Sequence, residues 1–150
     1  MIEIRTLGPV EVLVDDGEPP RELLWKKNVF LLLYLARSKG GRRSREHLVG
    51  MLWGDRPDAT ARHSLNEALR VLRRACEDDA LQSVGDQIVL DVESVRLDVE
   101  KLERLVEAGE WNQATAMVRG SWMEGFAVPG CDEVEDWLAA ERSHWNRIAR

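Results

Sequence analysis

The sequence predicts an α+β fold: a small antiparallel sheet, a three-helix core and a C-terminal β-hairpin, followed by an all-α segment. Three observations predict this order. Apolar and polar residues alternate at the start of the chain, helical periodicity replaces that alternation from Leu23 onward, and two strand-like runs flank Gly85-Asp86. After Asp98 the pattern is helical again, so we expect a boundary between residues 1–97 and 98–150.

The predicted sheet comes from the first residues of the chain. Residues 2–6 alternate as a half-buried strand does, and residues 10–14 repeat the pattern after the break at Gly8-Pro9. Asp15-Asp16-Gly17 is a turn signal, and residues 95–97 could add a further strand. Since the strands precede all helices, we expect the opening sheet to be antiparallel.

Three helices are predicted next. Apolar residues recur at helical spacing from Leu23 to Ser38. Ser44 is a good N-cap for a second helix that ends at Trp53-Gly54, and the third helix runs from about Ala59 to Cys76. The following pair of strand-like runs, 81–84 and 87–91, predicts a hairpin.

Charge is divided unevenly along the chain. The net charge is −6, but residues 1–76 contain 14 Lys/Arg and 10 Asp/Glu, whereas residues 77–150 contain 7 and 17. Ten basic and four acidic residues lie between Arg37 and Arg74. A basic patch joined to an acidic remainder is typical of a protein that places one part on a phosphate backbone.

The third helix carries the mixed side chains that base recognition requires. Arg pairs with guanine, Asn with adenine and Glu with cytosine in the major groove, whereas pure positive charge holds only phosphate. We expect Arg62 and Arg73, which lie nearest the apolar stripe, to reach around it or to pair with acids. The face opposite the stripe holds His63, Glu67, Arg70 and Arg74, and one flank holds Arg62, Asn66 and Arg73.

Strands, three helices and a hairpin in this order are typical of a winged helix, whose third helix enters the major groove while the hairpin contacts the backbone or minor groove. The start of the second helix fits this interpretation, because helix N-termini favour phosphate. Its basic residues are Lys39, Arg42, Arg43 and Arg45.

Short motifs along residues 1–97 resemble one family of DNA-binding domains: the OmpR-type winged helix of the Streptomyces antibiotic regulatory protein (SARP) family. Residues 98–150 resemble the start of that family's bacterial transcriptional activator domain (BTAD), a helical tetratricopeptide-like (TPR-like) module that usually continues with further helices. The motifs are Ile4–Val12, Leu31–Ala36, Ser44–Leu48, Leu52–Pro57, Ala61–Leu65 and Leu72–Ala75, then Asp98–Gly109, Gly120–Phe126 and Trp137–Arg142.

The resemblance implies a cytoplasmic transcription activator. It would bind direct repeats in double-stranded promoter DNA as a head-to-tail homodimer and contact RNA polymerase through the loop between the second and third helices. The candidate DNA-binding residues combine those of the third helix and of the start of the second helix with Gln87 of the hairpin. They are Arg42, Arg43, Ser44, Arg62, His63, Asn66, Glu67, Arg70, Arg73, Arg74 and Gln87. The candidate polymerase contacts are Trp53, Gly54, Asp55, Arg56 and Asp58.

An enzyme is not expected. Three His and two Cys residues are scattered without metal-ligand spacing, and no phosphate-binding loop or nucleophile motif occurs, so we expect no catalytic residue, metal or cofactor. Two cysteines suit a reducing cytoplasm. The longest apolar run, Val29–Ala36, is far shorter than the roughly 20 residues that span a bilayer, and the strand-like N-terminus is unlike a secretory signal.

The alternative hypothesis is a protein–protein interaction module. The acidic helical half would then bind a partner, and the basic half would have the winged-helix fold without reading DNA. The discriminating feature is the basic outward face of the third helix, which only the DNA-binding hypothesis requires.

Overall fold

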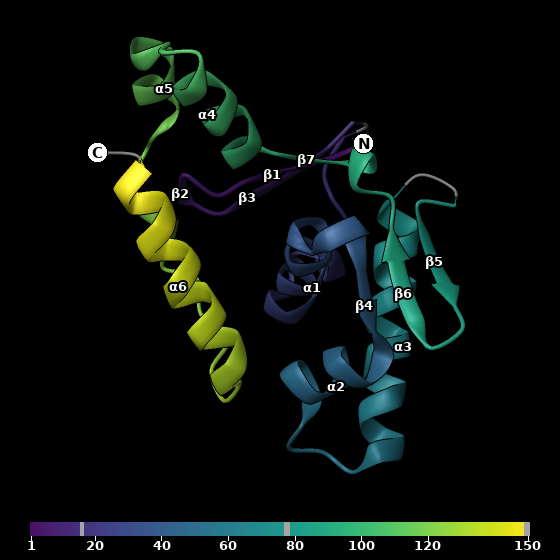
Figure 1. Cartoon of the computed structure of the whole chain (residues 1–150). Coiled ribbons are helices and arrows are strands. Elements are labelled where there is room, and N and C mark those ends of the chain that lie inside the picture. The colour runs from purple at the N-terminus through teal and green to yellow at the C-terminus, as the bar shows by residue number, and fades with distance from the viewer. Residues whose placement is uncertain (16, 77–78, 149–150) are drawn as a thin grey trace.

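The helices of the computed structural model account for most of the chain (Figure 1). The structure describes residues 1–15, 17–76 and 79–148. Short 3-10 turns precede or follow several elements: η1 (Arg21–Leu24), η2 (Lys39–Gly41) and η3 (Val92–Ser94). The α-helices of the described residues are α1 (Lys26–Arg37), α2 (Arg45–Trp53), α3 (Asp58–Ala75), α4 (Asp98–Glu107), α5 (Trp111–Met117) and α6 (Asp132–Ile148).

Three small sheets connect these helices. In the first, β1 (Ile2–Arg5) lies between β3 (Glu11–Val14), which is antiparallel to it, and β7 (Val95–Leu97), which is parallel. The second pairs β2 (Gly8–Pro9) with β8 (Trp122–Glu124) in parallel. The third has the order β4 (Arg42–Ser44), β6 (Gln87–Leu90), β5 (Leu81–Val84), and all its pairs are antiparallel.

Several predicted elements are confirmed. Strands β1 and β3 and the hairpin of β5 and β6 lie where the alternation places them, and α3 runs from Asp58 to Ala75. Ser44 caps α2, since its hydroxyl accepts a hydrogen bond of 3.1 Å from the His47 amide. The local periodicity and capping signals therefore predict these elements correctly.

The predicted fold class is wrong. The first sheet is mixed rather than antiparallel, because β7 joins β1 in parallel. The segment after residue 97 is neither all-α nor a separate TPR-like array, because β8 pairs with β2 and α6 packs on α2. The physical reason is burial: Trp122 and Met123 are almost fully enclosed, so this strand completes the core of the first part. The division into 1–97 and 98–150 stays a prediction.

Helix α1 lies at the centre of the core. Every residue from Asn28 to Ala36 is buried, because α1 packs between α3 and the C-terminal helix α6. Trp137 of α6 contacts the rings of Phe30 and Tyr34 edge-on, with ring centroids 5.5 and 5.3 Å apart. One continuous cluster of buried side chains therefore includes residues from both ends of the chain. Among the described helices, none has the length and apolarity needed to cross a bilayer.

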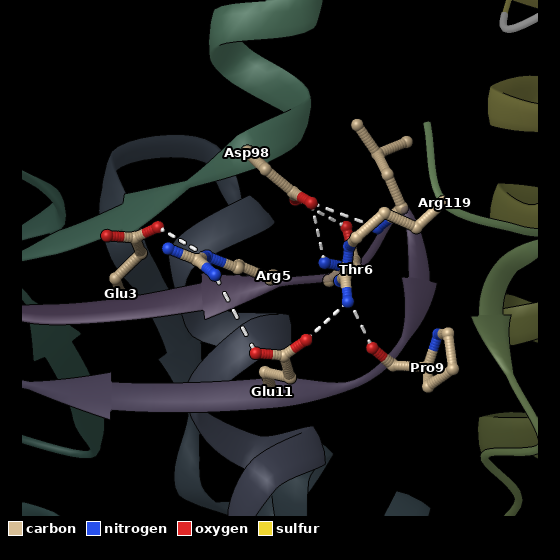
Figure 2. A network of polar contacts seen from close by, with 8 residues as sticks. Glu3, Arg5, Thr6, Pro9, Glu11, Asp98 and Arg119 are labelled. Atoms are coloured by element: carbon tan, nitrogen blue, oxygen red, sulfur yellow. Dashed lines mark hydrogen bonds and ion pairs between the residues drawn. The ribbon is translucent and has the colours of Figure 1, made fainter. Parts of the chain in front are cut away.

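A polar network, which we call the Asp98 junction, joins α4 to the first sheet (Figure 2). The Asp98 carboxylate accepts hydrogen bonds from the Thr6 amide (2.8 Å), the Thr6 hydroxyl (2.7 Å) and the Leu7 amide (2.9 Å). Beside it, Glu11 pairs with the guanidinium groups of Arg5 and Arg119. We define the junction as Arg5, Thr6, Leu7, Glu11, Asp98 and Arg119.

Candidate nucleic-acid interface

Helix α3 is amphipathic along its whole length. Its buried stripe comprises Ala61, Leu65, Ala68, Leu69, Val71 and Leu72. Asp58 lies in the first turn, while Arg73 and Arg74 lie in the last, and this distribution suits the helix dipole. One polar side of α3 faces the β5–β6 hairpin and another faces η1, and these two sides differ in their charged partners.

Arg45 links three elements on the hairpin side of α3. Its amide donates to the Asp86 carbonyl at 2.9 Å, which fixes the start of α2 against the hairpin turn. Its guanidinium donates to the Asn66 side-chain oxygen of α3 (2.9 Å) and to the Ser83 hydroxyl of β5 (3.4 Å). Helix α3, the start of α2 and the hairpin therefore share one continuous polar surface.

Arg73 joins this surface further along the helix. It donates to the Ser83 hydroxyl at 3.0 Å and to the Leu81 carbonyl at 3.5 Å. Arg62 lies at the other end, in a hollow of about 380 Å³ that Arg45, Glu46, Asp58 and Asp86 also line. We call Arg45, Arg62, Asn66, Arg73 and Ser83 the α3–hairpin surface.

The three arginines of the α3–hairpin surface form no ion pairs among the described residues, although Glu46, Asp58 and Asp86 line the hollow beside Arg45 and Arg62. Arg45 and Arg73 donate only to neutral oxygen atoms, and among the described residues none of the three has a carboxylate partner in an ion pair. Of the two alternatives expected for Arg62 and Arg73, pairing with acids is not found among the described residues, and Arg73 instead reaches the β5–β6 hairpin. Because Arg62 and Arg73 lie three turns apart on one side of α3, their cations span about 16 Å of helix.

Arg70 is the arginine of α3 that is paired with acids. It lies 3.0 Å from Glu67 on the same helix and 3.7 Å from Glu22 of η1. His63 and Glu67 face a neighbouring hollow that Trp25 also lines. His63, Glu67 and Arg70 therefore lie at the surface, as predicted. Glu67 and Glu22 compensate most of the positive charge of Arg70.

The remaining DNA-binding candidates lie in different environments. Arg42 is exposed on β4, whereas Arg43 stacks on the Tyr34 ring at 4.6 Å and donates to the Ser38 hydroxyl at 2.8 Å. Gln87 is half-buried opposite Ser44 in the β4–β6 pair. Arg74 lies near Val14 and Glu18, away from the hairpin. Of this group, Arg42 and Arg74 form no side-chain hydrogen bond or ion pair with other described residues.

The candidate polymerase loop joins α2 to α3. Gly54, Asp55, Arg56 and Asp58 are exposed, but Trp53 is buried under the ammonium group of Lys27. Arg56 donates to Ser64 at 2.9 Å, which holds the loop against α3. Gly54 is required sterically, since a Cβ there would lie 2.6 Å from the Gly50 carbonyl.

Sequence reasoning missed Ser83 and left Arg45 out of the final candidate set. Arg45 is one of the basic residues at the start of α2. The sequence therefore predicts its positive charge there, but it does not predict its contacts with Asn66 and Ser83. Ser83 carries no distinguishing signal, because an exposed serine in a hairpin is common and only the pairing of β5 with β6 brings it to α3. No protein-family model and no curated protein sequence matches this chain.

Proposed function

We propose that this chain is a sequence-specific DNA-binding transcriptional regulator that reads promoter DNA through α3. The observation that carries the proposal is the set of three arginines that form no ion pair with described residues, gathered with Asn66 along one side of α3 and at the start of α2. Arginine recognises guanine and phosphate, and Asn recognises adenine, so this surface offers both base readout and backbone contact.

The hairpin supports the same proposal. Ser83 and Asp86 tie it to α3 and α2 through Arg45 and Arg73, so the hairpin and the helix can approach a duplex as one rigid surface. Exposed Arg42 on the adjacent strand would add a phosphate contact. Rigid placement of such groups favours specificity, because little ordering is left to occur on binding.

The further parts of the proposal rest on the resemblance to the SARP family. They are activation of transcription, contact with RNA polymerase through Gly54, Asp55, Arg56 and Asp58, and a head-to-tail homodimer on direct repeats. A cytoplasmic location belongs with them, since Cys76 and Cys131 are buried thiols.

The second candidate function is that of an interaction module that binds a protein partner with its acidic half. The observation that favours it is Trp111, which is 61% exposed at the start of α5. Exposed aromatic residues are enriched at protein interfaces. This candidate requires no DNA binding by α3.

Selection of bound duplexes from a randomised pool tests the proposal, with competitor DNA and about 150 mM salt to suppress non-specific retention. We expect enrichment of two direct half-sites about one helical turn apart. Arg73→Glu should abolish the enrichment, whereas Arg147→Glu, which makes the same charge change on exposed α6, should preserve it. Absence of enrichment, or equal losses in the two variants, would support the interaction module instead.

A further inference from the structure

A cleft of about 560 Å³ lies between the first sheet and helices α4 and α5. Its lining comes from β1, β7, α4, the end of α5 and the segment that follows it. Helices α4 and α5 lie at the opposite end of the molecule from α2 (Figure 1). A volume of this size is typical of sites for small molecules.

Positive charge is concentrated in this cleft. Five lining residues are cationic, and four of the five come from the acidic half, residues 77–150. That half contains only seven Lys/Arg against 17 Asp/Glu, so the fold gathers more than half of its cations in one place. The five are Arg5, Arg96, Lys101, Arg104 and Arg119.

Two of these cations, Arg5 and Arg119, already have partners within the fold. So do two of the three lining carboxylates, Glu3 and Asp98. Arg5 lies 3.0 Å from Glu3, and Glu11 pairs with both Arg5 and Arg119 (Figure 2). The Asp98 carboxylate accepts three hydrogen bonds from Thr6 and Leu7. These groups therefore form a fixed floor, in which Arg5 and Arg119 are paired with carboxylates and Asp98, whose donors are neutral, keeps its negative charge.

The other three cations are available. Arg96 is exposed on β7, and Lys101 and Arg104 are exposed one turn apart on α4. Within the described chain, none of the three forms a salt bridge, and Glu100 is the one uncommitted carboxylate in the lining. The three cations outnumber Asp98 and Glu100, the lining carboxylates that form no ion pair with described residues, so the cations repel one another and a bound polyanion would relieve this repulsion.

We propose that this cleft binds a small aliphatic organic phosphate that carries two or more negative charges. Arg96 and Arg104 offer planar guanidinium forks that match phosphate geometry, and Lys101 adds a compact point charge. Leu97 and Met117 provide apolar surface for a carbon skeleton. The described lining includes no aromatic ring on which a base could stack, so the chemistry favours a sugar phosphate over a nucleotide.

Isothermal titration calorimetry with fructose 1,6-bisphosphate tests the proposal at about 150 mM salt, where weak surface attraction is screened. We expect saturable binding of one molecule per chain. Arg96→Gln and Arg104→Gln should each weaken binding about tenfold or more, because each removes a charged hydrogen-bond donor. Arg147→Gln is the matched control on α6, and it should leave the affinity unchanged.

Three results would overturn the proposal. The first is the absence of saturable binding, and the second is an equal loss in Arg147→Gln, which would indicate attraction to net charge alone. The third is binding of citrate as tight as that of the bisphosphate, which would exclude selectivity for phosphate. Arg73→Glu should retain bisphosphate binding, since Arg73 lies on α3 outside the cleft, so this measurement is independent of DNA binding.

Discussion

The α3–hairpin surface and the Asp98 junction contain similar polar residues, but these residues are bonded to different partners. In the junction, Asp98 accepts hydrogen bonds from the amides of Thr6 and Leu7, directly after β1, and Arg5 and Arg119 pair with carboxylates. On the α3–hairpin surface, arginines donate only to neutral oxygen atoms. Polar groups whose hydrogen bonds are satisfied within the fold stabilise it, whereas cations that form no ion pair remain available to a partner.

The largest effect that this comparison predicts is the loss of Asp98. Asp98→Ala removes the acceptor of three hydrogen bonds from Thr6 and Leu7, both of which are almost fully buried. We expect the free energy of unfolding to fall by about 3 kcal/mol, since each buried unsatisfied donor costs about 1–3 kcal/mol. Urea denaturation followed by circular dichroism measures this change. Asp86→Ala, in the exposed hairpin turn, should change stability by less than about 0.5 kcal/mol; equal losses would contradict the structural role of the junction.

A smaller effect is predicted for the unmatched arginines of α3. Arg62→Ala should weaken binding to the selected duplex by about 1–3 kcal/mol, the usual value of an arginine–guanine contact. Arg70→Ala should weaken it much less, because Glu67 and Glu22 already compensate that charge. Fluorescence anisotropy with labelled duplex provides both affinities. A greater loss in Arg70→Ala would assign base readout to the other side of the helix.

Release of Arg70 from its partner sharpens the comparison further. Glu67→Gln removes the carboxylate 3.0 Å from Arg70, and affinity for DNA should rise about threefold, close to the value of an exposed ion pair. The rise stays partial because Glu22 remains 3.7 Å away. Glu107→Gln, an equal charge change at the exposed end of α4, is the control in the same anisotropy assay. An equal rise in both variants would show that only net charge matters.

The smallest predicted effect concerns alkaline pH. Burial raises the pKa of the Cys131 thiol above its ordinary value of 9.0, so the folded chain holds this proton more tightly than the unfolded chain does. The resulting stability is complete below pH 9 and is lost as the pH rises through the folded pKa. Unfolding free energies measured at pH 7 and pH 10 should therefore differ less in Cys131→Ala than in the natural chain. An unchanged difference would exclude a contribution from this thiol.

Local patterns predict the helices and the hairpin well because their causes are local. The apolar stripe of α3 repeats every three to four residues, and the Ser44 cap acts within one helical turn. The parallel pairs of β1 with β7 and of β2 with β8 join segments far apart along the chain, and such pairing leaves no period in the sequence. Trp122–Glu124 is also too short for alternation to reveal a strand.

The candidate site was only partly predictable for the same reason. The spacing on α3 indicates which residues leave the apolar stripe, but it does not indicate their partners. Arg70 is paired because η1 brings Glu22 to it, whereas Arg62 shares a hollow with Glu46, Asp58 and Asp86 but forms no ion pair with any described residue. Trp53 was predicted as a contact residue, yet the packing of Lys27 over it makes it inaccessible.

The parallel pairing of β1 has a consequence for the order of folding during synthesis. Strand β3 emerges from the ribosome soon after β1, but β7 and Asp98 emerge much later, since Asp98 lies 92 positions after Thr6 in the sequence. One edge of β1 therefore stays open until β7 has been synthesised, and an open edge invites pairing with other chains. Closure of so distant a contact also slows folding, so β1 is synthesised early but gains its second neighbour late.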